Sequence, residues 1–504
     1  MRIIPLLLVF SLFAQDNANI PTKYATTGSI GTVTLNGQVY NQLSIRPEIP
    51  IGKLGVGLDI YLYFNDEGMY WDSWDFSSGG SAYKTIIDKI YYLRWGQPGD
   101  NIYFMAGALP SVTLGQGILV NNYANIMEYP QVRQVGLNLQ AKVAGFGIEL
   151  IHSNFKSATP GILGIRGSRS ILSKLSLGVS FVTDLNQLSG LPNSDGDNYP
   201  DYYDFYPGDE NKWDDSTKAR IEWDGFNNFL LDQGKDPLSD SKFMVWFEES
   251  KYYNSYNPFE AISDPVSGLA IDATYSLSEK MTLYSQFGLL KGEIADPEDN
   301  SKMVDLGWGL VPIGVRAQLG PVNLLAEYRM GSRRFVFNYW DRAYDVNRVS
   351  IINSDTGAEV ATRESQLYLY GELNGFYAQA EMSVMNLFTL SSGYQNMQGE
   401  KWDEIAGGYD PDKSNSTFLS TIAINPSLIP KVGKAEAFYQ QSNVLNPFDF
   451  SPTSSTIWGY NVGVEVSSGV MLMYKARTTY ISDLENEGEF IPVESIQIET
   501  QFIF

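Results

Sequence analysis

The sequence predicts an all-β fold, a transmembrane antiparallel up-and-down β-barrel of about 18 strands, within a range of roughly 16 to 20. Three observations predict it. Apolar residues alternate with polar or small ones, short and long connections alternate along the chain, and no later segment is apolar for the roughly 18 residues of a transmembrane helix. The chain has 504 residues, of which 43% are hydrophobic and 13% aromatic, enough for one large sheet closed on itself.

The composition excludes several functional classes. The chain has no Cys, which excludes disulfides and thiol chemistry, and a single His, which argues against a zinc site. The net charge of −23 argues against nucleic-acid binding, because phosphates would be repelled and no run of Lys and Arg compensates. An acidic balance of this size is typical of a surface protein that attracts cations.

The first residues are predicted to be an export signal. Residues 1–14 read MRIIPLLLVFSLFA, in which Arg2 is positively charged, a short apolar core follows, and Ala14 is a small residue at the expected cleavage point. The stretch is too short to span a bilayer and is typical of a secretory signal peptide. A buried strand or helix is the alternative, and the polar sequence QDNAN that follows argues against it. Residues 15–504 are then expected to form a single barrel domain.

The segment 53–64 establishes a period of two. A strand places alternate residues on one face, whereas a helix would distribute the same residues around its axis. The face is about 11 residues long, the length that a tilted strand needs to cross a bilayer. The apolar set is Leu54, Val56, Leu58, Ile60, Leu62 and Phe64, with Gly55, Gly57, Asp59, Tyr61 and Tyr63 between. The same alternation recurs at 135–143, 269–277, 281–289, 456–466 and 470–481.

The connections alternate in length, as in outer-membrane barrels with short turns at one rim and long loops at the other. Tight connections are expected near 48–52, 97–100, 144–146, 169–173, 278–280, 319–321, 373–375, 426–430 and 467–469. Long polar ones are expected near 65–83, 110–130, 186–262, 331–361, 391–415, 443–455 and 482–492. This pattern gives about nineteen strands, an odd number that single-chain barrels avoid. Either a strand at 26–35 is missing from the count, or one at 161–168 is false.

Polar residues within the apolar strands are expected to face the lumen, while the apolar residues face lipid and Tyr and Trp mark the membrane interfaces. The lumen set is Asp59, Gln140, Glu327, Glu372, Gln379 and Glu381. A soluble sandwich would present the same alternation, with its polar face in solvent. The signals at the two ends of the chain favour the barrel.

The last segment alternates in the same way and stops at Phe504, with Ile496, Ile498 and Phe502 on one face. Here the chain resembles bacterial outer-membrane β-barrel proteins of the porin-like kind, whose closing strand ends in an aromatic residue. The resemblance implies the outer membrane of a diderm, Gram-negative-type bacterium, contact with its lipid, and recognition of the terminal strand by the barrel-assembly machinery. It covers the architecture only, so it implies no particular solute.

One acidic motif stands out in the long loop 186–262. The segment 193–204 reads NSDGDNYPDYYD, and its oxygen-bearing residues occupy positions 1, 3, 5, 9 and 12 of a calcium loop, with the Tyr199 carbonyl at position 7. Calcium takes six to eight hard oxygens, which a loop wrapped round the ion can supply. The predicted ligands are Asn193, Asp195, Asp197, Tyr199, Asp201 and Asp204.

No helical pattern flanks this motif, and the segment is similar to a thrombospondin type 3 calcium repeat, a short, helix-free, Asp-rich unit. Pro200 and Pro207 fit that style, whereas Asn198 stands where Gly is usual. The resemblance implies a structural Ca²⁺ that stiffens the loop. A solvated acidic loop is the alternative, and the five-position spacing favours calcium.

Three other features carry weaker hypotheses. His152-Ser153 would suit a barrel hydrolase, but no active-site pattern surrounds it. Gly115-Gln116-Gly117 precedes no helix, so a bend, a constriction or a loop folded into the lumen is favoured over a phosphate site. Arg329, Arg333 and Arg334 suggest either a basic patch or a solvated strand end.

The predicted function is a non-enzymatic, porin-like channel for small polar solutes or ions, weakly cation-preferring because of its inward carboxylates. The first alternative is a non-conducting surface or assembly protein that binds a partner through its long loops. A lumen filled by 65–83 or 110–130 would favour this alternative. A barrel hydrolase is a distant second alternative.

Overall fold

The computed structural model describes residues 25–35, 38–127, 133–156, 161–191, 193, 199–209, 211–253, 265–354, 357–385, 387–403, 406–425, 429–453, 456–467, 470–482 and 490–503. The predicted signal peptide at 1–14 and the terminal Phe504 lie outside these residues. The chain divides into two compact units, Met1–Leu185 with Pro265–Phe504, and Asn186–Asp264.

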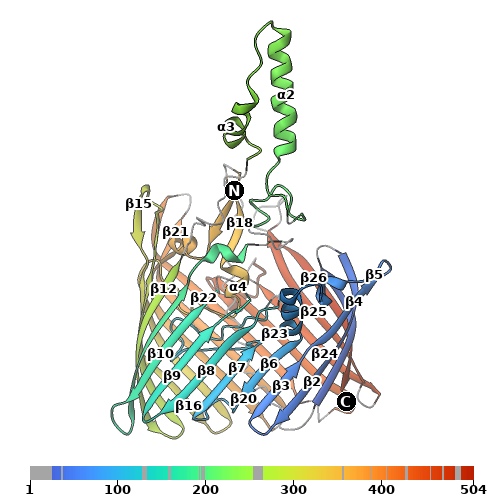
Figure 1. Cartoon of the computed structure of the whole chain (residues 1–504). Coiled ribbons are helices and arrows are strands. Elements are labelled where there is room, and N and C mark those ends of the chain that lie inside the picture. Colours follow the sequence, from blue (N-terminus) through green and yellow to red (C-terminus); the bar gives the residue numbers. More distant parts are fainter. Residues whose placement is uncertain are drawn as a thin grey trace. The chain divides into compact units, whose positions relative to one another are not determined.

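The first unit is a sheet closed on itself (Figure 1). Strand β1 (Ala25–Leu35) pairs antiparallel with β2 (Gln38–Ile51) on one side and with β26 (Phe490–Ile503) on the other. Thr27, for example, lies opposite both Arg46 and Ile503. The first and last strands therefore meet, and the sheet has no free edge at this point, which is the requirement for a sheet in lipid.

Between these ends the strands pair antiparallel, mostly in chain order. Their bounds are β3 (Leu54–Leu58), β4 (Ile60–Asn65), β5 (Gly68–Met69), β6 (Ile90–Trp95), β7 (Ile102–Gly107), β8 (Gly136–Val143), β9 (Phe146–His152), β10 (Leu163–Ser170), β11 (Leu175–Asp184), β12 (Val266–Ser278), β13 (Met281–Lys291), β16 (Trp308–Leu319), β17 (Val322–Gly331), β20 (Tyr370–Val384), β21 (Phe388–Asp403), β22 (Gly408–Ile424), β23 (Val432–Val444), β24 (Ile457–Ser467) and β25 (Val470–Ser482). Two hairpins stand apart from the wall, β14 (Glu293–Asp296) with β15 (Asp299–Asp305) and β18 (Val349–Ser354) with β19 (Gly357–Thr362).

The wall of the barrel has an even number of crossings. Within the described residues the sheet has 22 strands, of which β3 and β4 lie end to end along β2, and β5 is a two-residue extension against β4. When β3 and β4 are counted as one strand and β5 is left out, about 20 strands cross the wall, which is the upper end of the predicted range. Both doubtful strands are real, because 26–35 falls in β1 and most of 161–168 falls in β10.

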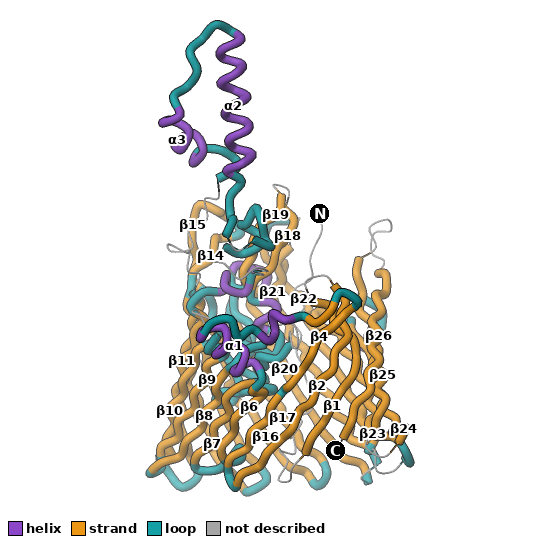
Figure 2. Tube along the Cα trace, turned by 45° about the vertical axis from the view of Figure 1, so that its right-hand side comes forward, coloured by secondary structure: helices purple, strands orange, loops and turns teal. Residues whose placement is uncertain are grey.

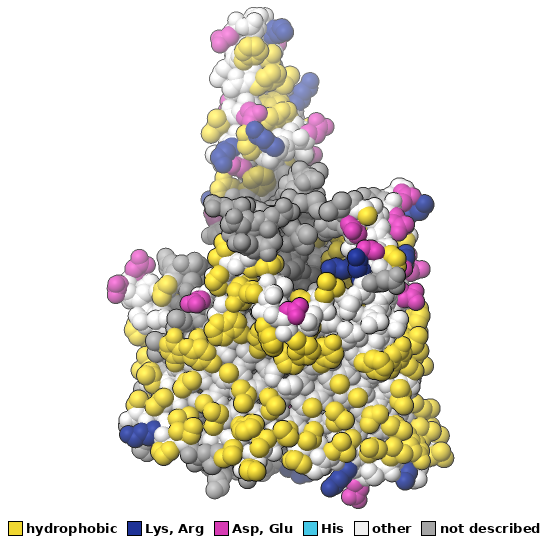
Figure 3. Space-filling model, turned by 180° about the vertical axis from the view of Figure 1, so that it is seen from behind, with side chains coloured by type: hydrophobic (Ala, Val, Ile, Leu, Met, Phe, Trp, Pro, Cys, Tyr) yellow, Lys and Arg dark blue, Asp and Glu magenta, His cyan; other side chains and the backbone are white. Residues whose placement is uncertain are grey.

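The predicted period of two is confirmed at 53–64, although the backbone ladder is interrupted at Asp59. Ile60 and Phe64 are each 39% exposed, whereas Tyr61 and Tyr63, on the inner face, are almost fully buried. Apolar side chains are spread over the outer face of the wall, and charged ones gather towards its rims (Figure 3). The outer face therefore has the character that lipid requires.

The short turns gather at one rim and the longer connections at the other (Figure 2). Two predicted connections are wrong. β20 runs straight through 373–375 and ends at Val384, and β21 begins at Phe388. Gly375 lies opposite Met397, where a Cβ would collide with the Asn396 carbonyl oxygen. The predicted loop 391–415 is mostly the hairpin of β21 and β22. Close strand packing, rather than a turn, explains the glycine of the pair Asn374-Gly375 within this predicted connection.

The second unit, Asn186–Asp264, contains helices that the sequence analysis missed. They are η2 (Gln187–Gly190), α2 (Ser216–Asp232), η3 (Asp240–Lys242) and α3 (Phe243–Glu248). The Asp215 side chain caps α2 by accepting from Lys218 N, and Trp223 is buried against Trp246, with ring centroids 5.4 Å apart. Ile221 and Leu231 of α2 are exposed, so its apolar residues do not lie on a single face. The hydrophobic repeat that predicts a helix is therefore not recognisable in this part of the sequence.

The described helices of both units are too short or too polar for any of them to cross a membrane.

Candidate functional site: the lumen and its two inward-folded loops

The inner face of the barrel carries the polar residues that the strand register brings side by side. Residues directly opposed in an antiparallel sheet point to the same face. Arg166 of β10 lies opposite Glu149 and Ser180, and Asp272 of β12 lies opposite Gln286. Arg166 donates to Asp272 through Nε (3.0 Å) and Nη2 (2.8 Å) and also binds Glu149. The polar inner wall is thus built by five strands, β9 to β13, and its charges are paired.

The first inward-folded loop connects β7 to β8 and contains Gly115-Gln116-Gly117. Its two arms pair, since Val112 N donates to the Tyr123 carbonyl (2.8 Å) and Tyr123 N donates back (2.9 Å). Gly115 and Gly117 both have positive φ, which the tight bend at the tip requires. Val120 and Tyr123 are fully buried. The predicted bend, folded into the lumen, is confirmed.

Side chains of the barrel wall hold the tip of this first loop. Ile118 N donates to Gln286 Oε1 (3.1 Å), Gln116 Nε2 donates to Thr274 Oγ1 (3.0 Å), and Arg316 Nη2 donates to the Gln116 carbonyl (3.3 Å). The three wall residues come from β12, β13 and β16, so the loop lies against this side of the lumen.

The second inward-folded loop lies between β17 and β20 and contains α4 (Tyr344–Asn347), β18, β19 and η4 (Ser365–Leu369). Trp340 N donates to the Leu119 carbonyl (3.0 Å), and the Trp340 carbonyl accepts from Asn121 N (3.1 Å). The two loops therefore form one backbone-paired body inside the barrel. The buried apolar residues that they share with the wall are Leu109, Val112, Leu114, Ile118, Leu119, Val120, Tyr123, Ile151, Val182, Val266, Leu290, Val311, Phe335, Phe337, Tyr339, Trp340, Tyr344 and Leu367.

Buried carboxylates and arginines link the second loop to the wall. Tyr344 donates to Asp184 Oδ2 (2.9 Å), and Arg348 Nη1 lies 3.3 Å from the same oxygen, so α4 is tied to the end of β11. Tyr123 donates to Asp345 Oδ2 at 2.6 Å, which ties α4 to the first loop. Burial raises the pKa of Asp345, although Arg348 and the Tyr123 hydroxyl oppose this.

A second buried pair closes the base of the second loop. Arg363 donates to both carboxylate oxygens of Asp341, at 3.2 Å and 2.9 Å, and both side chains are less than one-tenth exposed. A two-pronged arginine–carboxylate pair fixes orientation as well as distance. The position of this loop is therefore specified by polar contacts in addition to its apolar core.

The opposite side of the lumen is more accessible. There the inner face of β23 presents Lys434 and Glu436, with side chains 45% and 19% exposed. In the register of β24 and β25, Asn461 lies between Glu436 and Lys475, and Arg477, exposed, follows Lys475 on the same face. The inner residues of β10 to β13 are instead buried under the two loops. The accessible part of the lumen is thus lined by residues of both charges.

A further ionic cluster lies on the inner face beside β2 and β4. Asp59, which is fully buried, binds Arg46 Nε at 3.0 Å and Arg133 Nη1 at 2.5 Å. The guanidinium of Arg133 lies 3.6 Å from the Tyr61 ring centroid, and Lys89 Nζ lies 3.8 Å from it. Burial, with the charge of Arg133, lowers the pKa of Lys89 to about 8. The lumen carboxylate predicted at position 59 is therefore neutralised by two arginines.

The described part of the predicted calcium segment contains Asn193, Tyr199, Asp201 and Asp204, whereas Asp195 and Asp197 lie outside the described residues. Asp204 is buried and accepts from Tyr206 N at 2.8 Å, and the Tyr199 ring stacks on Trp213 with centroids 5.1 Å apart. Helix α2, which the sequence analysis missed, begins only at Ser216, well beyond the end of the segment at Asp204. Within the described residues no cluster of acidic or imidazole side chains forms a metal site.

The remaining hypotheses concern His152 and three arginines. His152 stacks on Phe155 at 4.0 Å, and Ser153 Oγ accepts from Ile162 N, so both side chains serve local packing. The arginines form no common patch. Arg329 is buried and donates to Glu327, Arg333 pairs with Glu400, and Arg334 donates to the Asp305 carbonyl.

Sequence reasoning missed the residues that position the two loops, namely Asp184, Asp341, Asp345, Arg348 and Arg363. Arg166 and Asp272, for comparison, are 106 residues apart in the sequence. No local spacing marks such partners, because strand pairing brings them together. A buried charge in a loop otherwise rich in apolar residues was the available signal.

No family model and no curated protein matches the chain. Among solved structures, Pseudomonas aeruginosa OccK11 (OpdR) is 10% identical, with 95% of this chain and 94% of that chain covered and a TM-score of 0.32. Pseudomonas aeruginosa OprD is 9% identical with the same coverage and TM-score. Wzi of Escherichia coli, a carbohydrate-binding barrel involved in capsule assembly, is 11% identical over 95% and 84% of the two chains, also at 0.32. The barrel assignment rests on the strand pairing of this chain itself.

Proposed function

We propose that the protein is a porin-like channel of the bacterial outer membrane that passes small polar solutes or ions. The observation that carries the proposal is the asymmetry of the lumen. The two inward-folded loops occupy the side of β9 to β16, while charged residues of β23 to β25 stay accessible. A barrel of about 20 strands is wide enough for water beside a partial filling.

The physical requirements of such a channel are met by separate parts of the chain. The outer face is apolar, and β1 pairs with β26, so the backbone has the pairing that lipid demands. The surrounding outer-membrane lipid and the assembly machinery, which would act on the strand ending at Phe504, are the partners that this proposal requires.

The accessible charges bear on selectivity. The sequence predicts a weak cation preference from inward carboxylates, but Asp59, Asp272 and Glu327 are each paired with arginine. A permeating solute would instead meet Lys434, Glu436, Lys475 and Arg477. We therefore propose that these residues, which carry both charges, give the channel only weak selectivity between cations and anions.

Reconstitution into planar bilayers tests the proposal. Discrete conductance steps in symmetric KCl are expected. A correctly folded barrel that never conducts would contradict the channel and support the second candidate, a non-conducting anchor, which the folding of 108–127 into the lumen favours. The variant Trp340→Ala separates the two, because loosening the paired loops should convert a blocked barrel into a leaky one.

The calcium loop remains part of the proposal. The ligand set Asn193, Asp195, Asp197, Tyr199, Asp201 and Asp204 would hold one structural Ca²⁺. Its support is the spacing in the sequence, together with the burial of Asp204, which is close in the sequence to the acidic residues Asp201 and Asp209. Bound calcium would neutralise these carboxylates and stiffen the segment.

A further inference from the structure

The wall of the barrel is low on one side. β6 and β7 have six residues each, and only four residue pairs join them. Six residues extend about 20 Å along a strand, and a tilt near 45° reduces this to about 14 Å, whereas a bilayer needs strands of about 9 to 11 residues. These two strands alone leave part of the apolar layer uncovered.

Beside this short part of the wall, β4 pairs with β2 on one edge but not with β6 on the other, because β6 begins only at Ile90 and pairs with β3. The edge of β4 is satisfied by the segment that follows it. The Tyr61 carbonyl accepts from the indole nitrogen of Trp74 at 2.8 Å, and the Tyr63 carbonyl accepts from Tyr70 N at 2.9 Å. A backbone edge at membrane depth must be paired, so this segment stands where a strand would otherwise stand.

We name residues 71–88, which comprise η1 (Trp71–Trp74) and α1 (Gly79–Asp88), the rim segment. Its large apolar side chains are exposed, with Trp71 at 66%, Phe76 at 58%, Tyr83 at 67% and Ile86 at 57%. The opposite side of α1 is held down, because Thr85 is buried and donates to the Asp75 carbonyl at 2.8 Å. Tyr83 and Ile86 are three residues apart, so they share one helix face.

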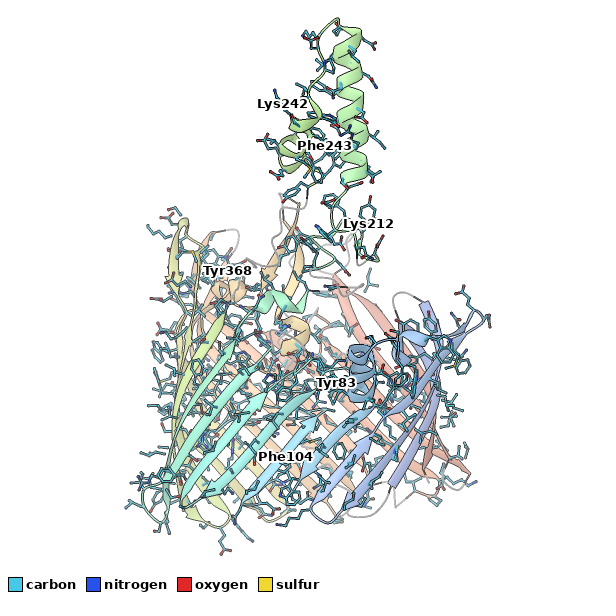
Figure 4. The ribbon with its side chains drawn as sticks, in the orientation of Figure 1. Tyr83, Phe104, Lys212, Lys242, Phe243 and Tyr368 are labelled. Atoms are coloured by element: carbon cyan, nitrogen blue, oxygen red, sulfur yellow. The ribbon has the colours of Figure 1, made fainter. Side chains whose placement is uncertain are left out.

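The exposed face continues the apolar outer surface of the neighbouring strands. Ile60 and Phe64 of β4, Trp95 of β6 and Ile102 of β7 are all large, apolar and at least 39% exposed. Tyr83 on α1 lies above Phe104 of β7, towards the rim of the long connections (Figure 4). Trp and Tyr are the residues that suit the boundary between hydrocarbon and headgroups.

We propose that the rim segment is a lipid-contacting part of the wall, with Tyr83 and Ile86 at the boundary between the acyl chains and headgroups. The partner is the bilayer, since the strands beneath are too short to fill its thickness and the adjoining strand surface is apolar. The segment replaces the missing upper halves of β6 and β7 with a short amphipathic helix. This assignment concerns membrane contact and stands apart from whether the barrel conducts.

Single-cysteine labelling tests this directly, because the chain has no Cys of its own. Nitroxides placed by Phe76→Cys, Tyr83→Cys and Ile86→Cys in lipid vesicles report accessibility to oxygen and to a water-soluble nickel chelate. Phe64→Cys, on the outer face of β4, is the lipid control, and Glu67→Cys, in the exposed turn after β4, is the water control.

The expected result is an oxygen-to-nickel accessibility ratio for Tyr83→Cys and Ile86→Cys within about twofold of Phe64→Cys and several-fold above Glu67→Cys. Ratios equal to that of Glu67→Cys at both positions would overturn the proposal and place the helix against water. Ile86→Lys provides an independent check, because a lipid-facing lysine should lower the yield of vesicle-inserted barrel, whereas Lys at a water-facing site should leave it unchanged.

Discussion

Trp340 and Val120 lie side by side in a parallel β-bridge inside the barrel, although they belong to different loops. The bridge is reinforced by packing, because both side chains are fully buried and the Trp340 ring lies where Gly268 of β12 has no side chain. One tryptophan thus connects the two inward-folded loops and the wall, so it is the position where a single change should loosen all three.

Replacing Trp340 by Ala is expected to destabilise the folded loops by about 3 to 5 kcal/mol, because it removes a large buried side chain and leaves a cavity. The midpoint of thermal unfolding in detergent should fall, and single-channel records should become noisier or larger in amplitude. Trp308→Ala is the matched control, since Trp308 is 38% exposed on the outer face. Equal effects of the two substitutions would contradict the role given to Trp340.

Asp345→Asn should change the pH dependence of stability. Burial raises the pKa of Asp345 above its ordinary value of 3.8, so the folded protein binds more protons than the unfolded chain between that value and the raised pKa. The stability of the wild type relative to the Asn variant should therefore fall as pH rises through this window. Denaturation midpoints measured from pH 4 to 8 test this, and a difference that is flat or rises with pH would refute it.

Asp59→Asn is expected to cost about 3 to 5 kcal/mol, because it removes the buried carboxylate that binds both Arg46 and Arg133. Asp66→Asn, in the exposed turn after β4, is the control and should change the unfolding midpoint little. If the two variants unfold alike, the cluster at Asp59 contributes nothing to the wall.

Arg477→Glu tests the proposed solute route. A charge change on an accessible inner face should move the reversal potential in a KCl gradient towards cation preference, because the local potential becomes more negative. Lys280→Glu makes the same charge change in the short turn between β12 and β13 and is the control. A shift only in the control would place the route elsewhere.

Calcium should bind the segment 193–204 with a heat that isothermal titration calorimetry detects on the full protein. Asp201→Asn and Asp204→Asn should each weaken binding at least tenfold, whereas Asp240→Asn, on η3, should not. Removal of calcium by a chelator should speed proteolysis within 186–264. Identical titrations for all variants would show that the acidic loop is merely solvated.

The sequence predicted the parts of the fold that depend on local alternation. The inner and outer faces at 53–64 follow from a period of two, and the turns near 97–100, 144–146 and 278–280 follow from local polarity. Its errors arose where tertiary packing overrides local signals. At Gly375, neighbouring strand backbones need the absence of a Cβ, which imitates a turn signal. In α2, exposed apolar residues obscure the helical period.

The sequence predicted acidic residues that face the lumen, but it did not predict the arginines with which they pair. Alternation marked Asp59 and Glu327 as inward residues, and both do lie on the inner face. Their arginine partners include Arg133, which comes from a connection between strands, and no spacing rule points to it. The same limit hid Asp341 and Arg363, which meet only after the second loop has folded.

The bond from the Trp74 indole to the Tyr61 carbonyl has a mechanical consequence. Neighbouring strands such as β20 and β21 are joined by long ladders of main-chain hydrogen bonds, whereas this edge of β4 is held by the Trp74 indole and by the hydrogen bond from Tyr70 N to the Tyr63 carbonyl. A rotamer change of Trp74 would break the hydrogen bond to the Tyr61 carbonyl without breaking a main-chain ladder. If the barrel wall opens laterally, it should open first at this edge of β4. The amides of residues 61–63 should then exchange with deuterium sooner than those of β21.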